Sequence, residues 1–190
     1  MSRRLVKIVV GIGAMAFGLA GCFTNGTTAT NTGVAGQPGA GLYRTLGDQG
    51  GACTVTRTDA ANTAHVYSNE TGGPLYIRVE ADDKSVTSKN CEPWLLAAFV
   101  RPIFLPGADF VSGDFRVNYE VLPGNYASSG TPANSGVCTW ARVGDFTHDG
   151  QGVIQATPGS QTDTHGTVTI ANGDFGFTSQ NCGTWHRTGP

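Results

Sequence analysis

The sequence predicts an all-β fold of two tandem, small, disulfide-stapled modules that follow an export signal and a flexible tether. Three observations lead to it: short runs of alternating apolar and polar residues, 28 glycines in 190 residues, and four cysteines in two similarly spaced pairs. Alternation is typical of half-buried strands, and glycine is common in the turns between them. Long helical periodicity is absent, so the strand pattern decides the fold class.

Residues 1–21 have the layout of an export signal. Arg3, Arg4 and Lys7 form a basic start, and an apolar run from Ile8 to Leu19 follows it. A run of this length falls short of the roughly 20 residues that a spanning helix needs. The segment is therefore predicted to direct export rather than to anchor the chain by itself.

The segment Leu19-Ala20-Gly21-Cys22 resembles the lipobox of bacterial lipoproteins. The resemblance implies cleavage before Cys22 and attachment of lipid to its sulfur, which would hold the protein on the extracytoplasmic face of the cell membrane. An ordinary cysteine after a secretory signal is the alternative. Residues 22–41 contain few large apolar side chains, so we expect a flexible tether there.

The charge of the exported part argues against nucleic acid as a partner. Removing residues 1–21 takes three of the 12 basic residues and none of the 14 acidic ones, so the formal charge moves from -2 to -5. Nucleic-acid binding depends on neutralising phosphates with Lys and Arg.

An internal repeat divides the remaining chain. Residues 177–185 echo residues 86–94, with Thr, Ser, Asn, Cys and Trp at matching positions. We therefore expect module 1 over residues 42–94, a connector over residues 95–113 and module 2 over residues 114–190. If each module carries its own bridge, Cys53 pairs with Cys91 and Cys138 with Cys182, and each bridge stabilises its module by roughly 4 kcal/mol.

Alternation places strands over residues 75–80, 114–121, 137–143, 166–171 and 175–179. Pro123 and Gly124 predict a turn, and Asn172-Gly173-Asp174 predicts a hairpin between the last two strands. Trp94 and Trp185, each three residues after a bridging cysteine, are expected to pack in the core.

Module 2 resembles short β-rich repeats in exported and lipid-anchored proteins of actinobacteria and their phages. The resemblance is carried by residues 115–126, by Cys138-Thr-Trp-Ala-Arg-Val143 and by residues 177–185, which end in Cys-Gly-Thr-Trp. It implies a β-rich fold and a surface location, and no reaction. Module 1 departs from the pattern, with Cys53-Thr-Val-Thr-Arg57 in place of the Trp-Ala-Arg strand.

Two groups of residues are candidates for function. Asp145, His148 and Asp149 could bind a metal or act as an acid/base pair, although a glycine-bounded loop is also an ordinary place for solvated Asp and His. Trp140 and Arg142 alternate onto one side of a strand and could form a binding face. No cofactor is expected, and common catalytic motifs are absent from the sequence.

These observations favour a non-enzymatic, membrane-anchored surface protein that recognises an envelope or phage component. One version is phage-encoded and modifies the host surface to exclude a second infection. A structural envelope lipoprotein is the alternative, and a cell-wall hydrolase is the least favoured function.

Overall fold

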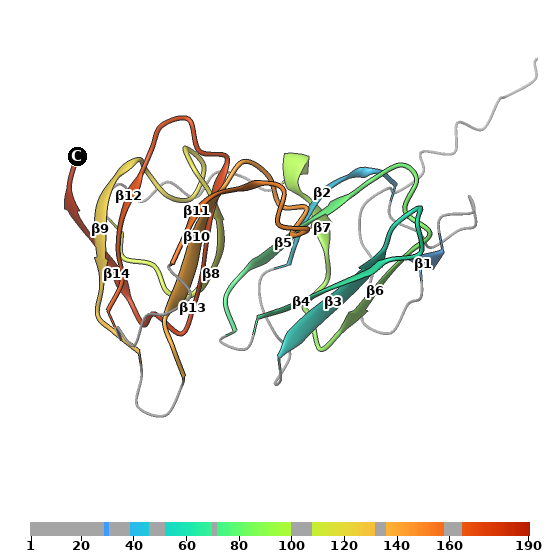
Figure 1. Ribbon diagram of the computed structural model, residues 1–190, viewed down its shortest axis with the longest axis horizontal. Helices are drawn as coiled ribbons and strands as arrows, with labels where there is room; N and C mark the ends of the chain where they lie inside the picture. Colours follow the sequence, from blue (N-terminus) through green and yellow to red (C-terminus); the bar gives the residue numbers. More distant parts are fainter. Residues whose placement is uncertain are drawn as a thin grey trace, which may run out of the picture.

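The computed structural model describes residues 29–30, 39–45, 52–69, 72–99, 108–131, 136–157 and 165–190, and they form an all-β protein of two modules (Figure 1). The signal, Cys22 and most of the tether lie outside these residues. Among the described residues, no helix has the length and apolar character needed to cross a membrane.

Module 1 is a sandwich of a four-stranded and a three-stranded sheet, with strand orders β1-β6-β3-β4 and β5-β2-β7. All its strand pairs are antiparallel. The elements are β1 (Ala29–Thr30), β2 (Gly41–Thr45), β3 (Cys53–Thr58), β4 (Ala64–Asn69), β5 (Leu75–Val79), β6 (Ser85–Lys89), β7 (Leu95–Leu96) and the 3-10 helix η1 (Ala97–Phe99).

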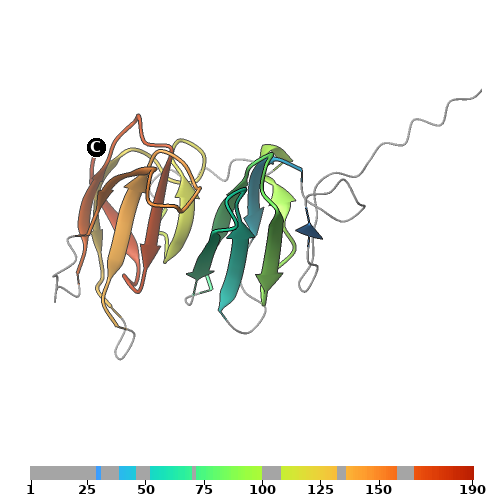
Figure 2. The ribbon, with the colours of Figure 1, turned by 45° about the vertical axis from the view of Figure 1, so that its right-hand side comes forward.

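Module 2 repeats this topology. Its sheets have the orders β11-β10-β13-β8 and β12-β9-β14. The strands are β8 (Gly113–Arg116), β9 (Gly124–Ser128), β10 (Thr139–Val143), β11 (Val153–Ala156), β12 (Thr167–Ile170), β13 (Gly176–Gln180) and β14 (Trp185–Gly189). The registers match as well: Val55 faces Ser88 across β3 and β6, and Trp140 faces Ser179 across β10 and β13. The predicted repeat is thus visible as two equivalent sandwiches, which Figure 2 shows side by side.

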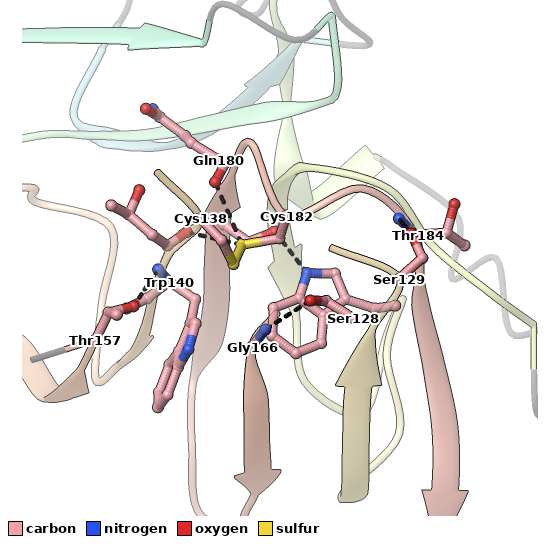
Figure 3. The surroundings of a disulfide bond; sticks show 12 residues. Ser128, Ser129, Cys138, Trp140, Thr157, Gly166, Gln180, Cys182 and Thr184 are labelled. Carbon is pink, nitrogen blue, oxygen red and sulfur yellow. Dashed lines mark hydrogen bonds between the residues drawn. A yellow bond between two sulfur atoms is a disulfide. The ribbon is translucent and has the colours of Figure 1, made fainter. Parts of the chain in front are cut away.

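Each module has its own disulfide and its own core. Cys53 is bonded to Cys91 and Cys138 to Cys182, which is the pairing that the repeat predicted. Trp94 and Trp185 are both fully buried in the core clusters that contain these cysteines, so their predicted packing role is confirmed. Figure 3 shows the second bridge, with Trp140 below it and the Gly166 amide donating to the Ser128 hydroxyl.

Gly166 is needed for this close packing. A Cβ at this position would lie 2.7 Å from the Trp185 ring and 3.2 Å from the Cys138 sulfur. Any larger side chain would therefore push the indole away from the bridge.

An Arg–Asp ion pair recurs in both modules, buried in module 1 and partly buried in module 2. The Arg57 guanidinium lies 3.0 Å from the Asp83 carboxylate, and the Arg142 guanidinium donates to both oxygens of Asp174 at 2.7 and 2.8 Å. Each Asp also accepts from a backbone amide three residues earlier, at Glu80 or Ala171. The pair thereby ties a central strand to the turn that carries the chain between the two sheets.

Two of the expected elements were wrong in detail. The strand predicted over residues 114–121 ends at Arg116, because Asn118 takes a positive φ of 63° and the chain turns back until Val121 bridges Val117. The predicted hairpin at residues 172–174 does not form, since β12 pairs with β9 whereas β13 pairs with β8 and β10. β12 and β13 belong to different sheets but direct apolar side chains into the same core, so the turn at residues 172–174 connects the two sheets.

Segments expected to lie outside the modules contribute strands to module 1. Ala29–Thr30, within the expected tether, pairs with β6, and Leu95–Leu96, at the start of the expected connector, pairs with β2. The two modules contact each other near η1, where Ala97 is buried in a cluster with residues of both modules.

Candidate functional site at the module interface

The two modules share a third apolar cluster of their own. Tyr76 and Ala97 from module 1 and Val143 and Phe146 from module 2 are buried together there. The rings of Tyr76 and Phe146 are stacked with centroids 4.9 Å apart. Burial of four side chains from both modules shows that the interface is a packed core and more than a surface contact.

Backbone hydrogen bonds also join the modules. The Asp114 amide donates to the Pro74 carbonyl at 2.8 Å, and the Arg78 amide donates to the Phe146 carbonyl at 3.0 Å. This close approach depends on Gly73, since a Cβ there would lie 1.8 Å from the Ser112 carbonyl oxygen. The chains of β5 and β8 therefore run against each other with no side chain between them at this point.

A buried charge network crosses the same interface. The Arg44 guanidinium lies 2.7 Å from Glu120, and the side chains of the two residues are only 8% and 7% exposed. The second Glu120 oxygen accepts from the Tyr76 hydroxyl at 2.8 Å and from the Arg116 amide at 3.0 Å. Burial and the nearby Glu120 carboxylate raise the pKa of Tyr76 well above its usual value, so its hydroxyl remains a donor.

The candidate acid/base residues lie in a loop that is part of this interface. The His148 ring packs on Tyr67 with centroids 4.5 Å apart, and its Nε2 lies 3.0 Å from the Tyr76 carbonyl and 3.3 Å from the Asp114 carboxylate. Burial alone would lower the pKa of His148, but the Asp114 carboxylate outweighs it and the pKa is raised. His148 thus acts as a contact between modules.

The two carboxylates of this loop are bound to the loop itself. Asp145 accepts from the amide and hydroxyl of Thr147, and Asp149 accepts from the Gln151 amide and the same hydroxyl. The Gln151 amide is the main reason why the pKa of Asp149 is lowered. No group of three His, Cys, Asp or Glu side chains that could hold a metal ion occurs within the described ranges, although Asp145 and His148 line one small pocket.

Trp140 and Arg142 do lie on one side of β10, as alternation predicted, but this side faces the interior of module 2. Trp140 is 8% exposed and belongs to the core, and Arg142 is held by Asp174 and Gln155. The expected binding face is therefore corrected: these two side chains serve packing and the Arg–Asp ion pair.

Sequence reasoning missed a cleft that opens along the interface. It has a volume of about 650 Å³ and is bordered by β2, β5, β7, η1, β8 and Phe175, the residue before β13. Arg78 comes from module 1 and Arg116 from module 2, and their guanidinium carbons lie 5.7 and 5.6 Å from the ring of Phe175. Alternation places Arg78 on the outer side of its strand, yet nothing in the sequence shows that it lines the same cleft as Arg116.

Comparison with known proteins places module 2 in an extracellular context. Neither a curated protein nor a solved structure matches the chain. Residues 106–186, which include nearly all of module 2, match the model of the Rv1352-like extracellular domain, and this likeness supports an extracellular protein family of actinobacterial type.

Proposed function

We propose that this chain is a lipid-anchored protein of the extracytoplasmic membrane face that acts by binding and performs no catalysis. The lipobox-like segment ending at Cys22 and the match to an extracellular domain support the location. Two disulfides suit an oxidising compartment outside the cytoplasm.

The observation that carries the binding role is the packed interface between the modules. Tandem modules that act independently need only a linker, whereas these share a buried cluster, backbone hydrogen bonds and a charge network. Such an interface fixes the two modules relative to each other and creates a cleft between them. Clefts at domain interfaces are common ligand sites.

The residues that could have supported a hydrolase are engaged in the fold. His148 contacts the opposite module, and Asp145 and Asp149 bind their own loop. A binding protein agrees better with this arrangement than an enzyme that uses these groups. The phage-related version of the function stays a prediction, and phage adsorption to cells that express the chain would test it.

The anchor can be tested by metabolic labelling with an alkyne-tagged fatty acid. We expect the full chain to be labelled and to remain with the membrane fraction, and Cys22→Ala to lose both properties. A labelled Cys22→Ala variant, or an unlabelled full chain, would contradict the anchor.

Binding can be tested on intact cells with a photo-crosslinking amino acid at Tyr119, which is 41% exposed at the rim of the cleft. The matched control carries the same group at Val66, which is 63% exposed on β4. One dominant product from position 119 that is absent from position 66 supports recognition at the cleft. The same diffuse products from both positions would favour a structural envelope protein.

A further inference from the structure

We propose that the cleft between the modules binds an anionic group, a phosphate or carboxylate, that is attached to an apolar or flat portion. This inference rests on the proposed function in that it names the ligand chemistry of the same interface. The cleft volume of about 650 Å³ lies within the range of roughly 300–1,000 Å³ that is usual for small-molecule sites.

The charge of the cleft supports an anion. Arg78 and Arg116 both line it, no acidic side chain does, and neither guanidinium forms an ion pair within the described part of the chain. Glu120, four residues after Arg116, is already committed to Arg44 and Tyr76, and Asp114 accepts from the Tyr76 amide. An arginine can donate two parallel hydrogen bonds to a carboxylate or phosphate, so two arginines that line one cleft without an ion pair among the described residues provide suitable donors for such a group.

The positions of the two arginines are fixed before any ligand arrives. The Arg116 guanidinium lies 3.8 Å from the centroid of the Tyr119 ring, and Phe175 lies near both guanidiniums. Cation–π contacts of this kind hold a guanidinium plane while leaving its N–H edges available to an acceptor. Holding the donors in place in this way lowers the entropy cost of binding.

The rest of the cleft is largely apolar, which favours a ligand with an apolar or flat portion next to its anionic group. Leu42, Leu96 and Ala97 line it, and Phe175 offers a partly buried aromatic ring. Inorganic phosphate would satisfy the arginines but leave this apolar surface in contact with water. A ligand with an apolar or aromatic portion next to its charge would cover it.

The test uses phenyl phosphate as the probe and the full chain with Cys22→Ser, which removes the lipid attachment site. Isothermal titration at low salt should show saturable binding of phenyl phosphate, about tenfold weaker binding of inorganic phosphate and no saturable binding of phenol. Arg78→Gln and Arg116→Gln should each weaken phenyl phosphate binding about tenfold or more, because each removes a charged donor pair.

Arg187→Gln is the matched control, since it removes the same charge from β14, where the Arg187 guanidinium is bonded to the Pro123 carbonyl outside the cleft. It should leave the affinity within twofold. Unfolding midpoints of all variants show whether they are folded. Absence of saturable binding, or equal weakening by Arg187→Gln in folded variants, would overturn the proposal.

Vesicles distinguish the two sources of such an anion. Binding to phosphatidylglycerol vesicles that is lost in Arg78→Gln and blocked by phenyl phosphate would identify a lipid headgroup. Phenyl phosphate binding without vesicle binding would identify a soluble ligand. Since the titration does not need the anchor, loss of fatty-acid labelling and loss of anion binding report separately on the proposed function and on this inference.

Discussion

Replacing Glu120 with glutamine removes one negative charge from the buried network without changing the side-chain size. Among the described residues, the charge of Arg44 then has no counter-ion, and its Nε and Nη1 have no hydrogen-bond partner there even before the replacement. Leaving one member of a buried ion pair unpaired costs about 3–5 kcal/mol. This is a large part of the roughly 5–15 kcal/mol that stabilises a typical protein.

The assay is equilibrium unfolding in urea, followed by tryptophan fluorescence, because each module has a buried tryptophan in its core. We expect the wild-type chain to unfold in one transition, since the interface couples the modules, and Glu120→Gln to lower its midpoint strongly. Glu92→Gln, a second glutamate that forms no ion pair within the described residues, is the control and should change the free energy of unfolding by less than about 0.5 kcal/mol.

A double replacement separates lost charge from lost packing. Arg44→Met with Glu120→Gln removes both charges and keeps an acceptor for the Tyr76 hydroxyl and the Arg116 amide, so it should cost less free energy of unfolding than Glu120→Gln alone. The reasoning is refuted if Glu120→Gln stays within about 1 kcal/mol of Glu92→Gln, or if the double variant is the least stable.

Three further predictions concern the same interface. Phe146→Ala should cost about 3–5 kcal/mol in a urea titration, because the fully buried ring leaves a cavity beside Tyr76, and a cost below 1 kcal/mol would contradict the packing. Gly73→Ala should lower the free energy of unfolding by at least about 2 kcal/mol, because the added Cβ clashes with Ser112. Gly173→Ala is the control and should be nearly neutral, since no atom lies within 4 Å of its added Cβ. Similar costs for the two variants would argue against the close approach. Because the pKa of His148 is raised in the folded state, its contribution to stability is complete below about pH 6.5 and is lost as the pH rises through the folded-state pKa. His148→Gln should therefore make the urea midpoint depend less on pH. An unchanged pH dependence would contradict the prediction.

The repeat and its disulfides could be predicted from the sequence because they depend on local spacing. One further signal was available and was not used. Arg57 and Arg142 each stand four residues after the first cysteine of their module, and Asp83 and Asp174 each stand eight residues before the second. The structure shows that these residues form the Arg–Asp ion pairs, so module 1 follows the pattern of module 2 more closely than its missing tryptophan suggested.

The interface could not be predicted in the same way. Its residues come from strands and turns that are distant in the chain, and alternation tells only which side of a strand a residue occupies. Alternation over residues 75–80 puts Tyr76 and Arg78 on one side of β5 and Leu75 and Ile77 on the other, but it does not show what covers either side. Only the fold shows that module 2 covers part of this side and leaves Arg78 in a cleft.

The arrangement of the candidate loop was unpredictable for a related reason. Asp145 and Asp149 both lie at the Thr147 hydroxyl, whereas His148 contacts the opposite module. Chemistry-bearing residues that are adjacent in a loop converge on one ligand only if the backbone directs them to one point. Here the Asp145 and Asp149 carboxylates accept from backbone amides of the same loop and stabilise its turn, in which His148 takes a positive φ of 53°.

The central claim is that the two modules form one rigid unit, and residual dipolar couplings of the backbone amides test it most directly. In a weakly aligned sample of the full chain with Cys22→Ser, couplings from module 1 and from module 2 are fitted separately to the structure. The account predicts that both modules give the same alignment tensor in magnitude and direction. Two tensors of clearly different magnitude would show that the modules move independently and would contradict the account.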